Sequence, residues 1–157
     1  MAHRDGIDDL GSLILNAGRP VLLAPNQTPE NLAPTIAIAW KETAEAARAI
    51  TAAMPLLAKA DRIHILSVED GRGSAATMES AERVAQQLRW HGLNIEAHYV
   101  VAGDHSVGDA IVKAARDNRA DLIVSGAYGH SRLRELVLGG ATRDLLRESL
   151  LPLFLFH

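Results

Sequence analysis

The sequence predicts an α/β protein with an open, parallel five-stranded sheet and helices on both of its faces. Two apolar runs, residues 35–40 and 121–125, have the near-continuous hydrophobicity of strands that are covered on both sides. Segments with helical spacing of apolar residues separate these runs from three further strand-like segments. Strands that alternate with helices form parallel sheets with right-handed crossovers. We therefore expect the strand order 3-2-1-4-5 within residues 35–157, with the two apolar runs at the centre.

Residues 1–34 are predicted to form a helix–strand extension and a linker. A helical pattern covers residues 7–17, and Gly18 is placed to end it. The following segment, 19–25, reads as a strand with a proline near each end, which indicates a sheet edge. Residues 26–34 contain two prolines among polar residues and are interpreted as a linker.

The first half of the main domain contains two strands, each followed by a helix. The strands are predicted at residues 35–40 and 63–68, with a polar loop over 69–76. Thr43 is a suitable N-cap for the first helix. The apolar positions expected to be buried in this helix are Ala47, Ile50, Met54 and Leu57. Those of the second helix are Met78, Ala81, Val84, Ala85 and Leu88.

The second half of the domain repeats this alternation. Residues 94–101 alternate between apolar and polar side chains, as a half-exposed edge strand does. Ser106 can cap the next helix, for which the expected buried positions are Ile111, Ala114 and Ala115. The strand at 121–125, a helix from Ala141 and a last strand at 152–156 complete the domain. The last strand is expected at the other edge of the sheet.

The chain contains one internal similarity. Leu13-Ile14 and the run Pro20–Leu23 correspond, at an offset of 132, to Leu145-Leu146 and the run Pro152–Leu155. The chain thus begins with what reads as a second copy of its own last helix and strand. A chance match is the alternative, because a proline followed by apolar residues is common at strand starts.

Composition excludes several classes of function. The net charge of −3 and the few aromatic residues argue against a nucleic-acid surface. The absence of cysteine excludes disulfides, thiolate catalysis and cysteine-bound metal centres. The sequence has no apolar run of the roughly 20 residues that a membrane helix needs, and its start does not resemble a signal peptide. We expect a cytoplasmic protein.

A glycine-rich segment follows the strand at 121–125. Gly126 and Gly129 come first, and Gly139 and Gly140 precede a helical pattern. A strand, a glycine-rich loop and a helix start form a common phosphate-binding arrangement, because free N–H groups and the helix dipole face the anion. The spacing matches neither of the two common phosphate-loop motifs. The alternative is that these glycines only form a tight turn and a bend.

This segment resembles the loop of universal stress proteins. Gly126-x2-Gly129-x9-Gly139 matches the family pattern G-x2-G-x9-G-[ST], and the resemblance covers about residues 35–157. Residues 7–25 look like the tail of a preceding half of a tandem-type member. The resemblance implies the same 3-2-1-4-5 sheet, usually dimeric through the last strand. It also implies that the loop glycines hold the phosphates of ATP and that an aspartate after the first strand contacts the adenine.

Two positions depart from the family pattern. Lys41 stands in the segment where the adenine-reading acid is expected, and Gly140 replaces the Ser or Thr after the third glycine. Lys41 could pair with a phosphate or remain a surface lysine. The candidate ligand-binding residues are Trp40, Lys41, Val68, Ser125, Gly126, Gly129, His130, Arg132, Gly139, Gly140, Ala141 and Thr142.

No catalytic residues are predicted. Ser125 and Ser131 lack a G-x-S-x-G elbow, and the H-x-G-H signature of nucleotidyl-transferring relatives of this fold is missing after the first strand. The seven histidines show neither an H-E-x-x-H motif nor a close ligand pair along the chain, so no metal site is expected.

Three functions remain. The first is a non-enzymatic stress-response protein that binds ATP or another phosphate ligand at the glycine loop. The second is a dimeric interaction module with a degenerate pocket, and a weak nucleotide hydrolase ranks third. We also expect a homodimer through edge strands, in which the strand at 21–24 covers the last strand within one chain or by exchange between two chains.

Overall fold

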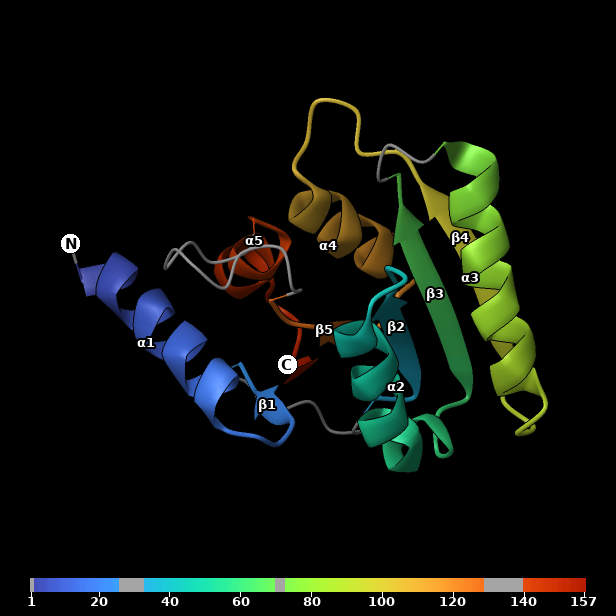
Figure 1. Ribbon diagram of the computed structural model, residues 1–157, viewed down its shortest axis with the longest axis horizontal. Coiled ribbons are helices and arrows are strands. Elements are labelled where there is room, and N and C mark those ends of the chain that lie inside the picture. Colours follow the sequence, from blue (N-terminus) through green and yellow to red (C-terminus); the bar gives the residue numbers. More distant parts are fainter. Residues whose placement is uncertain (1, 26–32, 70–72, 129–139) are drawn as a thin grey trace.

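The computed structural model describes residues 2–25, 33–69, 73–128 and 140–157 (Figure 1). In these residues, six strands form one sheet in the order β1-β6-β5-β2-β3-β4. The strands are β1 (Val21–Leu23), β2 (Thr35–Ala39), β3 (Arg62–Val68), β4 (Ile95–Val100), β5 (Leu122–Gly126) and β6 (Leu153–Phe156). The helices are α1 (Ala2–Asn16), α2 (Ala44–Leu57), α3 (Ser74–Arg89), α4 (Val107–Asp117) and α5 (Gly140–Glu148). The predicted parallel order is confirmed for β4-β3-β2-β5-β6, and β1 adds one antiparallel strand.

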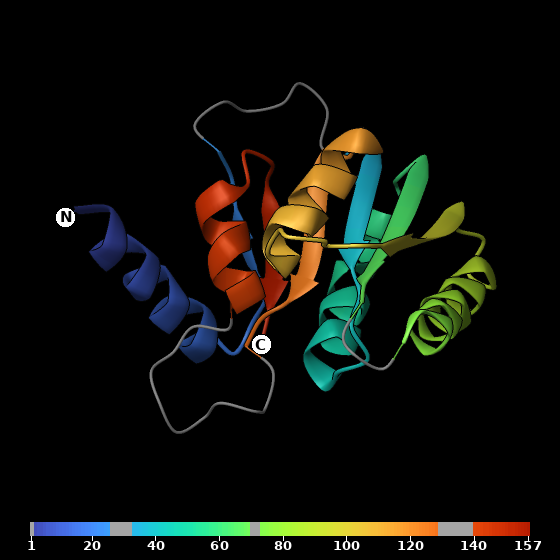
Figure 2. The same ribbon diagram turned by 90° about the horizontal axis from the view of Figure 1, so that it is seen from above.

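The sheet separates two hydrophobic cores. Helices α2 and α3 cover one face, and α4 and α5 cover the other (Figure 2). Successive residues of a strand point to opposite faces. In β2, Ile36 and Ile38 therefore join the first core, whereas Ala37 and Ala39 join the second. Because β2 is buried on both faces, its continuous apolar sequence is explained.

Two positions expected in the cores are exposed. Met78 is 54% exposed, and Ala47 is also exposed. The buried stripe of α3 begins at Thr77 and runs through Ser80 and Ala81, so Met78 is one residue out of phase. Thr77 tolerates burial because its Oγ1 donates a hydrogen bond to the Gly73 carbonyl at 3.1 Å. The prediction at Met78 is wrong because hydrophobicity alone does not identify a buried polar residue that has a local acceptor.

The N-terminal extension packs on the main domain. Strand β1 pairs with β6 within the chain, so the expected edge at β6 is covered and β1 forms the edge instead. Helix α1 starts before the predicted residue 7 and lies beside α5, at the opposite end of the molecule from β4 (Figures 1 and 2). It contributes Ile14 to the second core, which also contains Leu145. The prediction that Gly18 follows the helix end is consistent with its φ of +58°.

The contact between β1 and β6 has local two-fold symmetry in sequence. Leu22 pairs with Phe154, and these two positions are equivalent at the offset of 132. On either side, Val21 pairs with Leu155 and Leu23 with Leu153. At the same offset, Asn16 and Glu148 end α1 and α5. Two similar helix–strand units thus meet about a pseudo-two-fold axis in one chain.

The opposite edge of the sheet is β4, as predicted. Ile95 is buried, Glu96 is exposed, and the strand ends before Val101. In the described part of the chain, no helix has the length and apolar character that crossing a membrane requires.

Candidate functional site at the carboxyl edge of the sheet

The candidate site lies where β2 and β5 end side by side. The strand order changes direction here, because β2 leads to α2 on one face of the sheet and β5 leads towards α5 on the other. Open parallel sheets bind ligands outside the carboxyl ends of strands at such a switch point. Ala39 pairs with both Ser125 and Leu66, so the residues that follow β2 lie beside the ends of β5 and β3. The structure thus brings Trp40, Lys41, Val68, Ser125 and Gly126 to one edge of the sheet.

Gly126 lies against the first turn of α2. A Cβ at this position would be 2.5 Å from the Ala46 nitrogen and 2.7 Å from the Glu45 carbonyl carbon. Both are backbone atoms, which cannot move aside as a flexible side chain can. Gly126 therefore lets the start of α2 lie directly on the end of β5, a structural role that the sequence left open.

The turn between β2 and α2 is held by several hydrogen bonds. The Trp40 indole N–H donates to Ser80 Oγ at 3.0 Å, and the Trp40 carbonyl accepts from Ser67 Oγ at 3.2 Å. Thr43 Oγ1 accepts from the Ala46 N–H at 3.3 Å, which confirms Thr43 as the N-cap of α2. Lys41 is exposed between these anchored residues. The structure therefore gives Trp40 a structural partner and leaves the Lys41 side chain at the surface.

The exit of β5 is anchored to the C-terminus. The Ala127 N–H donates to the Phe156 carbonyl at 2.9 Å, and His157 Nδ1 lies 3.0 Å from the Ala127 carbonyl. The buried Ser125 donates its hydroxyl proton to the Gly126 carbonyl at 2.9 Å. Tyr128 has a φ of +56°, a conformation that costs free energy for a non-glycine residue. The backbone is thus fixed up to the residue before Gly129.

Helix α5 begins at the same edge of the sheet. Because β6 runs parallel to β5, α5 must return to the amino edge before β6 starts (Figure 2). The first N–H groups of a helix have no partner within the helix, and the dipole makes that end positive. In α5 these groups belong to Gly140, Ala141 and Thr142. Thr142 is buried, whereas Gly140 is exposed, so an anion from solvent can reach the first of these N–H groups.

Helix α4 sets the position of α5. A Cβ on Gly108 would lie 2.3 Å from Asp144 Cβ and 3.0 Å from the Ala141 carbonyl oxygen. The absence of a side chain at Gly108 allows the two helices to approach this closely. The start of α5 is therefore held by backbone contact with α4.

Four of the predicted site residues fall outside the described residues. They are Gly129, His130, Arg132 and Gly139. Their assignment to a ligand remains a prediction.

One acidic residue of this edge was not singled out in the sequence. Glu45 lies in the first turn of α2 and is only 1% exposed. Its backbone contacts the Gly126 position, so a buried carboxyl group lies at the helix start beside the end of β5. The available signal in the sequence was an acidic residue two positions after Thr43, the expected N-cap.

Two open depressions along α4 contain none of the predicted site residues, and both include Asp109 and Lys113.

Comparison with known proteins identifies a family. The model described as "Universal stress protein family" matches residues 33–157. The universal stress protein Slr1230 of Synechocystis is 33% identical over 98 residues, which are 60% of this chain and 32% of that protein. The chain thus spans about a third of the length of this curated relative.

Solved structures agree on the fold. A universal stress protein from Archaeoglobus fulgidus DSM 4304 superposes with a TM-score of 0.69 and 19% identity. That match covers 93% of this chain and 52% of the other, longer chain. A universal stress protein in complex with cAMP superposes with a TM-score of 0.62 and 22% identity, covering 81% of this chain and 98% of that chain.

Proposed function

Because the chain belongs to the universal stress protein family, we propose that it is a non-enzymatic stress-response protein that binds a nucleotide such as ATP, or another phosphate-bearing ligand. The ligand would occupy the carboxyl edge between β2 and β5. The observation that carries this proposal is that α5 begins at the carboxyl edge of the sheet with first-turn N–H groups that have no acceptor within the helix. The cAMP-bound relative of the same fold supports a nucleotide as the ligand class.

The phosphates would bind the backbone more than side chains. Gly140, Ala141 and Thr142 offer N–H groups, and the loop that carries Gly129 and Gly139 leads into them. An exposed Lys41 at the end of β2 provides a positive charge at the place where the family resemblance implies an adenine-reading acid. We therefore expect the site to favour the phosphate groups of a ligand and to select weakly for adenine.

Calorimetric titration of ATP into the purified protein tests this proposal. Wild-type protein is expected to give saturable heat, and Gly129→Val is expected to lose it, because a branched side chain blocks a backbone that has to approach the phosphates. Thermal unfolding of the variant serves as the control for its fold. A folded wild-type protein that gives no heat would contradict the proposal.

Gly140→Ser is expected to bind ATP roughly tenfold more tightly than wild type. The hydroxyl would restore the family's missing donor, and a hydrogen bond to a charged group contributes about 1.5–3 kcal/mol. No described atom lies within 4 Å of the Cβ position of Gly140, so the substitution has room. Gly140→Ala is the matched control because it adds a Cβ without a hydroxyl. Equal affinities for the serine and alanine variants would disprove this role.

A second candidate function is a dimeric interaction module with an empty pocket. The observation that favours it is a set of exposed leucines on the N-terminal extension. They are Leu13, Leu15 and Leu22, with exposed fractions of 51%, 40% and 47%. Strand β1 already covers β6 within the chain, so a dimer through β6 would require β1 to exchange between protomers. This candidate predicts a stable dimer, measurable by light scattering, together with no heat on addition of ATP.

We further propose that residues 1–34 are the end of a preceding repeat. The two-fold register of β1 and β6 at the offset of 132 supports this origin. The fold match that covers 93% of this chain within a chain about twice as long is consistent with it. In this view, α1 and β1 make with α5 and β6 the contact through which two repeats meet.

A further inference from the structure

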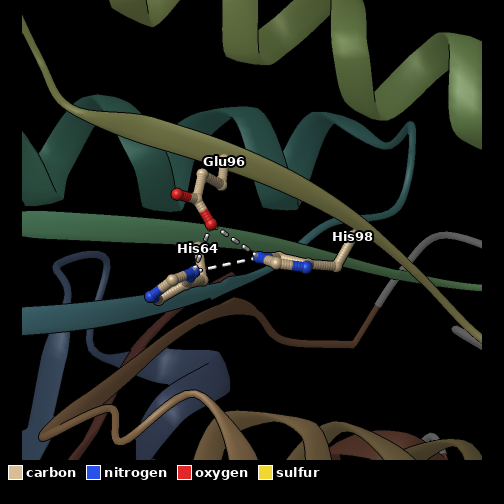
Figure 3. Close-up of side chains that lie close together, drawn as sticks. All are labelled: His64, Glu96 and His98. Atoms are coloured by element: carbon tan, nitrogen blue, oxygen red, sulfur yellow. Dashed lines mark hydrogen bonds and ion pairs between the residues drawn. The ribbon is translucent and has the colours of Figure 1, made fainter.

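Three potential metal ligands lie together on strands β3 and β4, away from the nucleotide edge. Figure 3 shows the rings of His64 and His98 and the carboxylate of Glu96 pointing toward one another. His64 is the third residue of β3, whereas the proposed nucleotide site begins beyond the other end of that strand. The cluster is therefore separate from the carboxyl edge of the sheet.

Strand register explains why these residues meet. Glu96 and His98 are two positions apart on β4, so both side chains leave the same face of the strand. The parallel register pairs Glu96 with His64 and His98 with Leu66. All three side chains lie on the sheet face whose neighbouring residues, Leu66 and Val100, pack in the core beneath α4. The spacing of histidines along the chain did not reveal this group, because His64 and His98 come together only through the pairing of β3 with β4.

We propose that His64, Glu96 and His98 form a binding site for a first-row divalent cation of the zinc type. His64 Nδ1 lies 2.9 Å from His98 Nε2, and Glu96 Oε2 lies 3.9 Å and 3.8 Å from these two nitrogens. A circle through three atoms with these separations has a radius of about 2.1 Å. Zinc binds imidazole nitrogen and carboxylate oxygen at about 2.0–2.2 Å, so one ion fits all three ligands with little rearrangement.

The chemistry of the donors suits this class of cation. Two imidazoles and one carboxylate match the His₂Glu sets that hold zinc with an open fourth position, whereas Mg²⁺ and Ca²⁺ prefer all-oxygen ligands.

The site has both a rigid side and an accessible side. The side chain of His64 is 6% exposed and is fixed in the sheet, whereas those of His98 and Glu96 are 30% and 63% exposed. An ion can therefore enter from solvent without opening the core. Once bound, it would connect the edge strand β4 to its neighbour β3, and we expect it to stabilise this edge.

Calorimetric titration of Zn²⁺ into untagged, EDTA-treated full-length protein tests the site. Wild type is expected to bind one equivalent with saturable heat and to unfold at a higher temperature with Zn²⁺, because a ligand of the folded state stabilises it. His98→Asn and Glu96→Gln should each weaken binding roughly tenfold or more, since loss of even an outer-shell partner can cost 10–100-fold. Both side chains are partly exposed, so these variants are expected to fold.

His91→Asn is the matched control because His91 is an exposed histidine outside the cluster. It should bind Zn²⁺ as wild type does, and Mg²⁺ should give no heat with any of these proteins. The proposal is overturned if wild type shows neither saturable heat nor a shift in unfolding temperature. It is also overturned if His98→Asn and Glu96→Gln bind Zn²⁺ as tightly as His91→Asn. ATP binding plays no part in these measurements, so the proposed function and the metal site can fail independently.

Discussion

Gly126→Ala is expected to lower the free energy of unfolding by roughly 1–3 kcal/mol, the usual cost of overpacking. The added Cβ would lie 2.5–2.9 Å from backbone atoms of Glu45 and Ala46 at the start of α2. The strain can be relieved only if α2 moves away from β5, which would also disturb the turn at Trp40 and Lys41. Urea denaturation measures the change directly. We expect ATP affinity to fall with stability, because the same movement displaces the candidate site.

Gly140→Ala is the matched control for this substitution. It also adds a Cβ to a glycine of the motif, at a position where no described atom lies within 4 Å. Alanine is favoured over glycine within a helix by about 1 kcal/mol, so this variant should be as stable as wild type or more stable. Equal stability of Gly126→Ala and wild type would contradict the close packing of α2 on β5.

Deletion of residues 1–25 is expected to destabilise the protein and to change its association state. The deletion removes Ile14, which is 1% exposed, and the pairing of β1 with β6. Burial of one isoleucine alone contributes about 1.5–3 kcal/mol. The deletion also leaves the apolar strand β6 as an uncovered edge of the sheet, and such edges pair with other chains. Thermal unfolding and light scattering should show a lower unfolding temperature and a larger molar mass.

Two point substitutions separate packing from chain length. Ile14→Ala should cost about 2–5 kcal/mol as a buried position, whereas Leu13→Ala, at a residue 51% exposed, should change stability little. A truncated protein with unchanged stability and unchanged molar mass would show that the extension has no structural role. In that case its proposed origin as part of a preceding repeat would lose its physical support.

The regular parts of the fold could be predicted because local patterns specify them. The apolar runs of β2 and β5 gave the centre of the sheet, and Thr43 gave the start of α2. Which residues of a helix face the core could be predicted less well. In α3 the buried position is Thr77, which has its own hydrogen-bond acceptor, and the neighbouring Met78 is exposed. The choice between pairing of β1 within one chain and exchange between two depended on tertiary contacts, which no local pattern contains.

The candidate site itself stays a prediction, and the structure shows only which of its residues come together. Lys41, Gly126 and Gly140 follow β2, end β5 and begin α5, so the structure brings them to the carboxyl edge of the sheet. The role of Gly126 depends on how closely α2 approaches, which is a property of the packed fold. The His64, Glu96 and His98 cluster depends on the register of two strands, and that register requires a sheet before it can be read. Residues 129–139 remain at the level of sequence prediction.

NMR titration of ATP into ¹⁵N-labelled protein shows where on the molecule a nucleotide binds. We expect concentration-dependent shifts of the backbone amides of Lys41, Gly126 and residues 140–142, with little change in β4. Gly129→Val should abolish these shifts while the rest of its spectrum stays that of a folded protein. An unchanged spectrum at saturating ATP, or shifts confined to the depressions along α4, would contradict a nucleotide site at the carboxyl edge between β2 and β5.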